Sequence, residues 1–150
     1  MKHYATLAEF QHLVDQPLGS SDWLSVEQDR INRFAEATGD HQWIHLDPER
    51  ARTGPFGAPI AHGFLTLSLL PVLFETAFAI DDVRMAVNYG LNRVRFMAPV
   101  KVGSRLRGHF KLLSFEPLEG GAQLTVQASI ELEGSAKPAC VAETVSRRYT

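Results

Sequence analysis

The chain has 150 residues, enough for one ordinary domain that buries a core without disulfides. It is 45% hydrophobic and 21% charged, with a net charge of -2, so composition gives no electrostatic reason to expect binding to nucleic acid or to an anionic membrane surface. The single cysteine, Cys140, excludes an internal disulfide, and no apolar stretch reaches the roughly 18 residues of a membrane span. A signal peptide is not expected either, because Glu9 occupies the place of its apolar centre. We therefore expect one domain, residues 1–150, soluble and cytoplasmic.

The first predicted helix starts at a capping box, Ser25–Gln28. In this motif the serine accepts a hydrogen bond from a first-turn amide, and Gln28 reaches back to the cap. Apolar side chains then recur at helical spacing, and Gly39 is suited to the left-handed conformation that ends a helix. Asp40 is therefore expected at the exit of this helix.

A second, short helix is predicted to begin at Asp47 and Pro48, an N-cap followed by a proline in the first turn. His45 comes just before it, five residues after Asp40. A carboxylate and an imidazole on one short segment can hold a water molecule between an acceptor and a donor. The pair is therefore typical of acid/base chemistry that adds water to a double bond or removes it.

A central helix is predicted over residues 62 to 79. Its stretch from Phe64 to Phe74 is apolar on nearly every face, so we expect the helix to be enclosed by the rest of the domain. Pro71 lacks an N–H and should kink the helix.

The period of the apolar pattern changes to two after Arg84, which predicts strands. Apolar residues alternate in three runs, at 85–91, 124–132 and 139–145. Proline and glycine at four places, Pro99, Gly103, Gly120–Gly121 and Gly134, divide the region into four or five antiparallel strands. Helices followed by strands predict an α+β domain in which a curved antiparallel sheet wraps the central helix.

Three segments, taken in order, resemble the MaoC-like dehydratases, also called R-specific or type 2 enoyl-CoA hydratases, and most of all their NodN-like branch. The segments are Phe34–His45, Pro59–Gly63 and Val94–Val100. The resemblance implies a hot-dog fold, an antiparallel sheet around a long central helix. It also implies a homodimer whose sheets join edge to edge, and an acyl thioester of coenzyme A or acyl carrier protein as the substrate.

The same resemblance implies that Asp40 and His45 are catalytic and that the backbone N–H of Gly63 meets the thioester carbonyl. Asp40 is expected to accept a proton from water, while His45 orients that water and helps return a proton to the α-carbon. An exposed amide at a helix N-terminus suits the negative charge that develops on the thioester oxygen. Gln42 and Trp43 stand where the family pattern usually has asparagine and proline.

Further contacts are predicted at Arg93 and Arg95, which alternate on a strand and can face the phosphates of coenzyme A or, equally, form an ordinary solvated strand face. Trp43 suits packing or a wall of the substrate pocket. His62 either lines the pocket or holds the turn before the helix, and it is left outside the catalytic set. Neither a metal nor a cofactor is expected, since the remaining histidines have no metal-ligand spacing.

The leading hypothesis is therefore an (R)-specific enoyl-CoA hydratase, a hydro-lyase that reversibly adds water to trans-2-enoyl-CoA to give (R)-3-hydroxyacyl-CoA. One alternative is a hot-dog acyl-CoA thioesterase, in which an acidic residue directs water at the thioester carbonyl. The other is a non-catalytic subunit that binds acyl thioesters.

Overall fold

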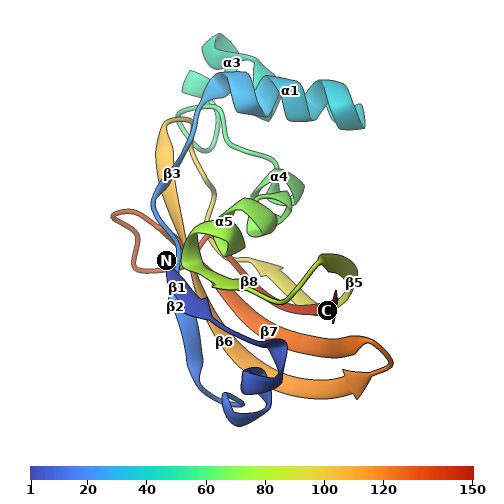
Figure 1. Ribbon diagram of the computed structural model, residues 1–150. Helices are drawn as coiled ribbons and strands as arrows, with labels where there is room; N and C mark the ends of the chain where they lie inside the picture. Colours follow the sequence, from blue (N-terminus) through green and yellow to red (C-terminus); the bar gives the residue numbers. More distant parts are fainter.

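Four long strands and two short ones form one curved sheet (Figure 1). The computed structural model describes residues 1–150. The strands of this sheet are β2 (Pro17–Ser20), β3 (Leu24–Val26), β5 (Met85–Phe96), β6 (Ser104–Leu118), β7 (Gly121–Leu132) and β8 (Cys140–Tyr149). Their order is β2-β6-β7-β8-β5, all pairs are antiparallel, and β3 also pairs with β6. The strands predicted from the period of two are confirmed, and β5 lies at one edge of the sheet.

Short N-terminal elements were not predicted from the sequence. β1 (Lys2–Tyr4) pairs in parallel with β4 (Phe78–Ile80), and the 3-10 helix η1 (Leu7–His12) follows β1. Tyr4 and Phe10 pack edge to face with ring centroids 4.8 Å apart. These elements are too short to show a period, and they form because their aromatic side chains complete the core.

The central helix is divided into α4 (Gly63–Ser68) and α5 (Leu70–Ala77). Pro71 lies in the first turn of α5, where a missing N–H costs least, so the predicted kink is confirmed as a break at Leu69. The prediction of one helix over residues 62 to 79 was wrong, because the chain leaves the helical conformation after Ala77 to enter β4.

Helices α4 and α5 lie within the curve of the sheet (Figure 1) and contribute Leu65, Leu70 and Leu73 to the core. The expected enclosure on all sides was wrong, because Phe64 is 69% exposed. Its ring packs edge to face against Phe96 of β5, which is also exposed. One face of the central helix is therefore open in the single chain.

Three further helices lie together beyond one end of the sheet (Figure 1): α1 (Gln28–Thr38), α2 (Trp43–Leu46) and α3 (Pro48–Arg52). The capping box predicted for α1 was wrong, because Ser25 belongs to β3 and Glu27 occupies the N-cap. The N-cap at Asp47 is confirmed, since its carboxylate accepts the N–H of Arg50 at 3.0 Å. No helix combines the length and the apolar character needed to cross a membrane.

Candidate active site

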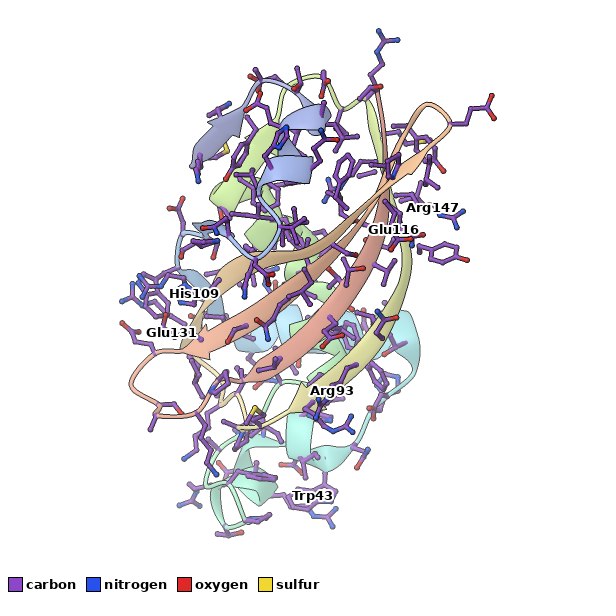
Figure 2. The ribbon with its side chains drawn as sticks, turned by 90° about the horizontal axis from the view of Figure 1, so that it is seen from below. Trp43, Arg93, His109, Glu116, Glu131 and Arg147 are labelled. Carbon is purple, nitrogen blue, oxygen red and sulfur yellow. The ribbon has the colours of Figure 1, made fainter.

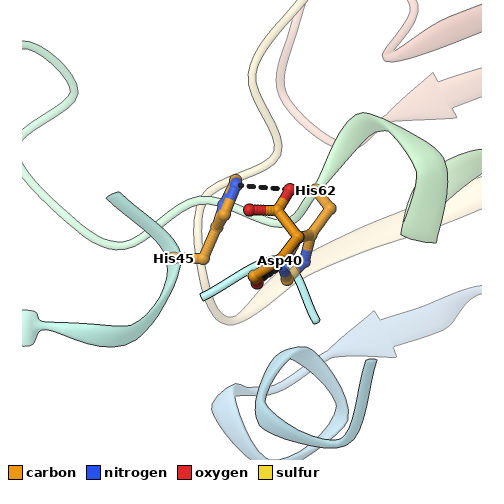
Figure 3. A group of neighbouring side chains, drawn as sticks. All are labelled: Asp40, His45 and His62. Atoms are coloured by element: carbon orange, nitrogen blue, oxygen red, sulfur yellow. Dashed lines mark hydrogen bonds and ion pairs between the residues drawn. The ribbon is translucent and has the colours of Figure 1, made fainter. Parts of the chain in front are cut away.

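Asp40 takes its position from the end of α1. Gly39 has φ 82°, and its N–H donates to the carbonyl of Ala35 at 2.8 Å, so the helix stops where the sequence predicted. The side chain of Asp40 is 42% exposed. One carboxylate oxygen, Oδ1, accepts a long hydrogen bond from the N–H of Gln42 at 3.4 Å. The other, Oδ2, points toward His45 (Figure 3).

His45 is buried within α2 rather than in a loop before α3. Its Nδ1 lies 2.7 Å from the carbonyl oxygen of Ile60. Because a carbonyl can only accept, Nδ1 carries the proton and Nε2 is left as an acceptor. The backbone of His45 is held as well, since the side-chain amide of Gln28 donates to its carbonyl at 2.8 Å.

The Nε2 of His45 and the Oδ2 of Asp40 are 4.0 Å apart (Figure 3). This separation is too long for a direct hydrogen bond, but a water molecule about 2.8 Å from each atom fits between them. Both groups would then accept a hydrogen from that water. The geometry differs here from the sequence-based expectation of one acceptor and one donor.

Burial is the main cause that lowers the pKa of His45 below 6.5. The hydrogen bond to Ile60 acts in the opposite direction, the neighbouring His62 lowers the pKa further, and Asp40 raises it. The net direction is downward, so the ring is neutral at pH 7 and Nε2 stays free to accept a proton.

His62 is a member of the site that the sequence reasoning left out. It is 2% exposed, and its Nε2 donates to the backbone carbonyl of Asp40 at 3.0 Å. Its ring stacks on that of His45 with centroids 3.8 Å apart (Figure 3), while its Nδ1 is buried without a partner. His62 thus joins the two predicted catalytic residues. Its place directly before Gly63 was the only signal available in the sequence.

The three side chains of Asp40, His45 and His62 are also the only group in the chain with the spacing of a metal site, each offering a ligand atom within 4.8 Å of the others. Two of the four ring nitrogens already bind backbone carbonyls. That leaves His45 Nε2, His62 Nδ1 and the carboxylate as potential ligands. The absence of a metal requirement remains a prediction.

Gly63 opens α4, and its N–H donates no hydrogen bond within the chain. Gly63 and His45 line the same hollow of ≈ 330 Å³. A Cβ at Gly63 would lie 2.9 Å from the ring of Phe96, which closes another side of the hollow. Glycine is therefore favoured by close packing, and it leaves a free amide in the same hollow as the imidazole of His45.

Arg93 and Arg95 lie on one face of β5, opposite Glu143 and Val141 of β8. Figure 2 shows Arg93 near the end of β5 that approaches the helices. The two arginines line a hollow of ≈ 420 Å³, and neither forms an ion pair. This hollow shares Phe96 with the hollow at His45. The arginines are therefore neighbours of the candidate site rather than part of it.

Trp43 begins α2 and does not line the hollow at His45. The guanidinium of Arg50 lies over its ring, 4.2 Å from the centroid, and a Cβ at Gly54 would lie 3.1 Å from the ring. The structure therefore shows a packing role for Trp43, and its role as a pocket wall remains a prediction.

Known proteins are similar to this chain in sequence and in architecture. Residues 9–133 match the family described as "MaoC like domain". The chain is 52% identical over 148 residues to 3-hydroxyacyl-thioester dehydratase Z of Mycobacterium tuberculosis (strain H37Rv). The aligned residues cover 98% of this chain and 98% of the relative. It is 47% identical to Nodulation protein N of Rhizobium leguminosarum bv. viciae, over 96% of this chain and 91% of the relative.

Solved structures agree in fold. The R-hydratase PhaJ1 from Pseudomonas aeruginosa superposes with a TM-score of 0.73 at 23% identity, over 96% of this chain and 85% of that one. The (R)-hydratase from A. caviae superposes with a TM-score of 0.61 at 23% identity, over 86% of this chain and 94% of that one. These likenesses confirm the predicted α+β hot-dog fold. With the sequence matches, they show that the chain belongs to the MaoC-like dehydratase family.

Proposed function

We propose that this protein is an (R)-specific enoyl-CoA hydratase, a hydro-lyase that reversibly adds water to trans-2-enoyl-CoA to give (R)-3-hydroxyacyl-CoA. The observation that carries the proposal is the pair of acceptors, Asp40 Oδ2 and His45 Nε2, 4.0 Å apart beside the free amide of Gly63. The dehydratase name of the Mycobacterium tuberculosis relative describes the reverse direction. The same groups serve both directions.

In the hydration direction, a single water molecule donates one of its hydrogens to Asp40 and its second hydrogen to His45. Its oxygen attacks the β-carbon while Asp40 takes the proton, and the electrons of the double bond move toward the thioester oxygen. The N–H of Gly63 donates to that oxygen as negative charge builds up on it. The proton held by Asp40 is then delivered to the α-carbon, so water and the enoyl thioester are consumed together and the side chains return to their starting state.

His62 acts in this scheme as a positioning residue. It holds the backbone of Asp40 through a hydrogen bond and the ring of His45 through stacking. Both contacts fix the distance between the two acceptors. A fixed distance is needed because small displacements of reacting groups cost large factors in rate.

Arg93 and Arg95 are proposed to bind the phosphates of the coenzyme A or acyl carrier protein that carries the acyl group. Their hollow adjoins the one at His45, and no carboxylate neutralises either guanidinium through an ion pair. Arginine pairs well with phosphate because its planar guanidinium can donate two hydrogen bonds at once.

The active form is proposed to be a homodimer formed through β5, working in the cytoplasm. β5 is an edge strand with five large exposed apolar side chains, Met85, Val87, Tyr89, Leu91 and Phe96. An exposed apolar edge of this kind is a surface that pairs with another strand. The buried, unpaired thiol of Cys140 is compatible with a reducing compartment.

The function is tested by mixing purified protein with crotonyl-CoA while following the absorbance of the conjugated enoyl thioester and the release of free thiol. We expect loss of absorbance without thiol release, unaffected by prior treatment with EDTA. Asp40→Asn and His45→Gln should each lower turnover about 10²- to 10⁴-fold without altering the circular dichroism spectrum. Asp29→Asn, which removes an exposed carboxylate on α1, is the control and should leave turnover unchanged.

Each other outcome points to a different function. Thiol release that depends on Asp40 would identify a thioesterase. Binding of acyl-CoA without any reaction would favour the non-catalytic subunit. Normal hydration by a folded Asp40→Asn protein would contradict the proposed mechanism.

A further inference from the structure

Arg148 is a guanidinium without a partner inside the protein. Its Nε is buried and has no hydrogen-bond acceptor, and its side chain forms no ion pair. Burial alone lowers its pKa. The neighbours opposite it on β5 and β7 are alanines, Ala86 and Ala122, which offer no polar group. Arg148 as a whole is half-buried, and a guanidinium nitrogen buried without an acceptor is costly, so this arginine indicates an acceptor from outside the chain.

Two further polar side chains lie close to Arg148 on the same face of the sheet. Ser146 precedes it by two residues on β8, and Asn88 of β5 is the residue opposite Ser146. Ser146 is 7% exposed. Neither side chain forms a hydrogen bond within the chain, so three donors without acceptors come from two neighbouring strands.

These three side chains line a cavity of ≈ 390 Å³ between the central helices and strands β5 and β8. The helix side of the cavity is mainly apolar, with Leu67, Leu70, Pro71 and Phe74. No carboxylate lines it. The cavity therefore joins an apolar wall to a positively charged end, as a ligand with an apolar stem and an anionic tip requires.

The cavity and the hollow at His45 share no lining residue, but both are lined by α4. Gly63 and Thr66 line the hollow at His45, and the next residues, Leu67 and Ser68, line the cavity. At about 1.5 Å per helical residue, Leu67 lies roughly 6 Å along α4 from Gly63. An acyl chain whose thioester lies at Gly63 would run along α4 toward Arg148.

We propose that Arg148, together with Ser146 and Asn88, binds a carboxylate at the far end of the acyl chain, so that the substrates include thioesters of dicarboxylic acids. This inference rests on the proposed hydratase function. Charge-assisted hydrogen bonds from a guanidinium to a carboxylate are strong and directional. They would select both for the terminal carboxylate and for the chain length that brings it to Arg148.

The test compares trans-2-enoyl-CoA substrates of several chain lengths, each with and without a terminal carboxylate. Wild-type protein should show a higher kcat/KM for the carboxylated substrate at one matching length. Arg148→Met should lower that value about 10- to 100-fold while leaving the plain substrate unchanged or improved. Arg33→Met is the control, because Arg33 is an exposed guanidinium on α1 that pairs with Asp29 and does not line the cavity.

Glu75 is the alternative partner for Arg148 within the chain. Glu75 lines a neighbouring hollow together with Arg148, but it is exposed and forms no ion pair with it. If Glu75→Gln reproduced the effect of Arg148→Met on both substrates, the two residues would be each other's partners and the proposal would be wrong.

The proposal would also be overturned if wild-type protein preferred the plain substrate at every length and Arg148→Met changed both substrates alike. A separate readout distinguishes this failure from a failure of the hydratase function. Calorimetric titration with saturated acyl-CoA, with and without the terminal carboxylate, measures binding without turnover. Tighter binding of the carboxylated ligand that is lost in Arg148→Met supports the site even if no enoyl thioester is hydrated.

Discussion

The protonation of His45 is decided by one backbone carbonyl. Ile60 fixes the proton on Nδ1, and burial disfavours a second proton on Nε2. The carbonyl itself is held in place, since the N–H of Ala61 in the same peptide plane donates to the carbonyl of Val100 at 2.7 Å. The proposed catalytic acceptor, Nε2 of His45, is thus prepared by main-chain hydrogen bonds that most substitutions would leave intact.

A pH dependence follows from this arrangement. The pKa of His45 lies below 6.5, so kcat/KM should be constant near pH 7 and fall as the pH drops through a pKa below 6.5, where Nε2 gains a proton and can no longer accept one. Stability follows the same direction: the unfolded state takes up the proton first, so stability is complete above pH 6.5 and declines below it.

The measurements are a pH profile of kcat/KM and a titration of the histidine ring signals by NMR. His12→Gln removes an exposed histidine on η1 and should leave the profile unchanged. An acidic limb with a pKa above 6.5 would contradict the assignment of Nε2 as the acceptor.

At the scale of elements, the end of α1 sets the position of Asp40, the proposed catalytic carboxylate. Gly39 adopts a left-handed φ of 82°, a conformation in which a side chain costs about 1–2 kcal/mol. Gly39→Ala should therefore lower the free energy of unfolding by about that amount. It should also lower kcat, because the relaxation of the helix end moves Asp40 away from His45.

Gly120→Ala is the control for this change. Gly120 has φ 72° in the turn between β6 and β7, and a Cβ there meets nothing within 4 Å, as at Gly39. Urea unfolding should show similar losses for both variants, whereas only Gly39→Ala should lower kcat. Equal kcat values would show that the helix end does not position Asp40.

The elements that the sequence predicted correctly are those with a local cause. The long strands show a period of two, and Gly39 marks the end of α1 in the residues themselves. Ser25 was misassigned because its capping motif competes with pairing to β6, and the pairing with Arg105 prevails. The end of α5 was missed for a similar reason. The helix ends because the next residues form β4, which pairs with β1, and these two strands lie far apart in the sequence.

The candidate site likewise contains residues that could be recognised from the sequence and residues that could not. Asp40 and His45 are five residues apart, so one segment brings them together and its pattern could be recognised. The contact of His62 with both of them depends on the route of the chain between α3 and α4, which has no periodic signal. Arg148 is further still from the other residues in the sequence, and only strand register places it beside Asn88.

At the scale of the whole molecule, the exposed edge of β5 predicts a dimer in solution. Val87→Arg places a charge on this edge, where two copies related by symmetry would bring two such charges close together. We expect the wild-type protein to sediment as a dimer and the variant to dissociate at micromolar concentration. Leu118→Arg, at the end of β6, is the control and should remain dimeric. A monomeric wild-type protein would contradict the prediction.

The proposed catalytic and positioning residues all lie in one continuous stretch, from Asp40 to Gly63, whereas the cavity at Arg148 is built from later residues, between Leu67 and Arg148. The proposed reaction and the choice of acyl group are therefore encoded in different parts of the gene. Mutations in the later part can alter which chains are accepted while the reacting groups keep their geometry. A fold divided in this way can give rise to enzymes with one chemistry and many substrates.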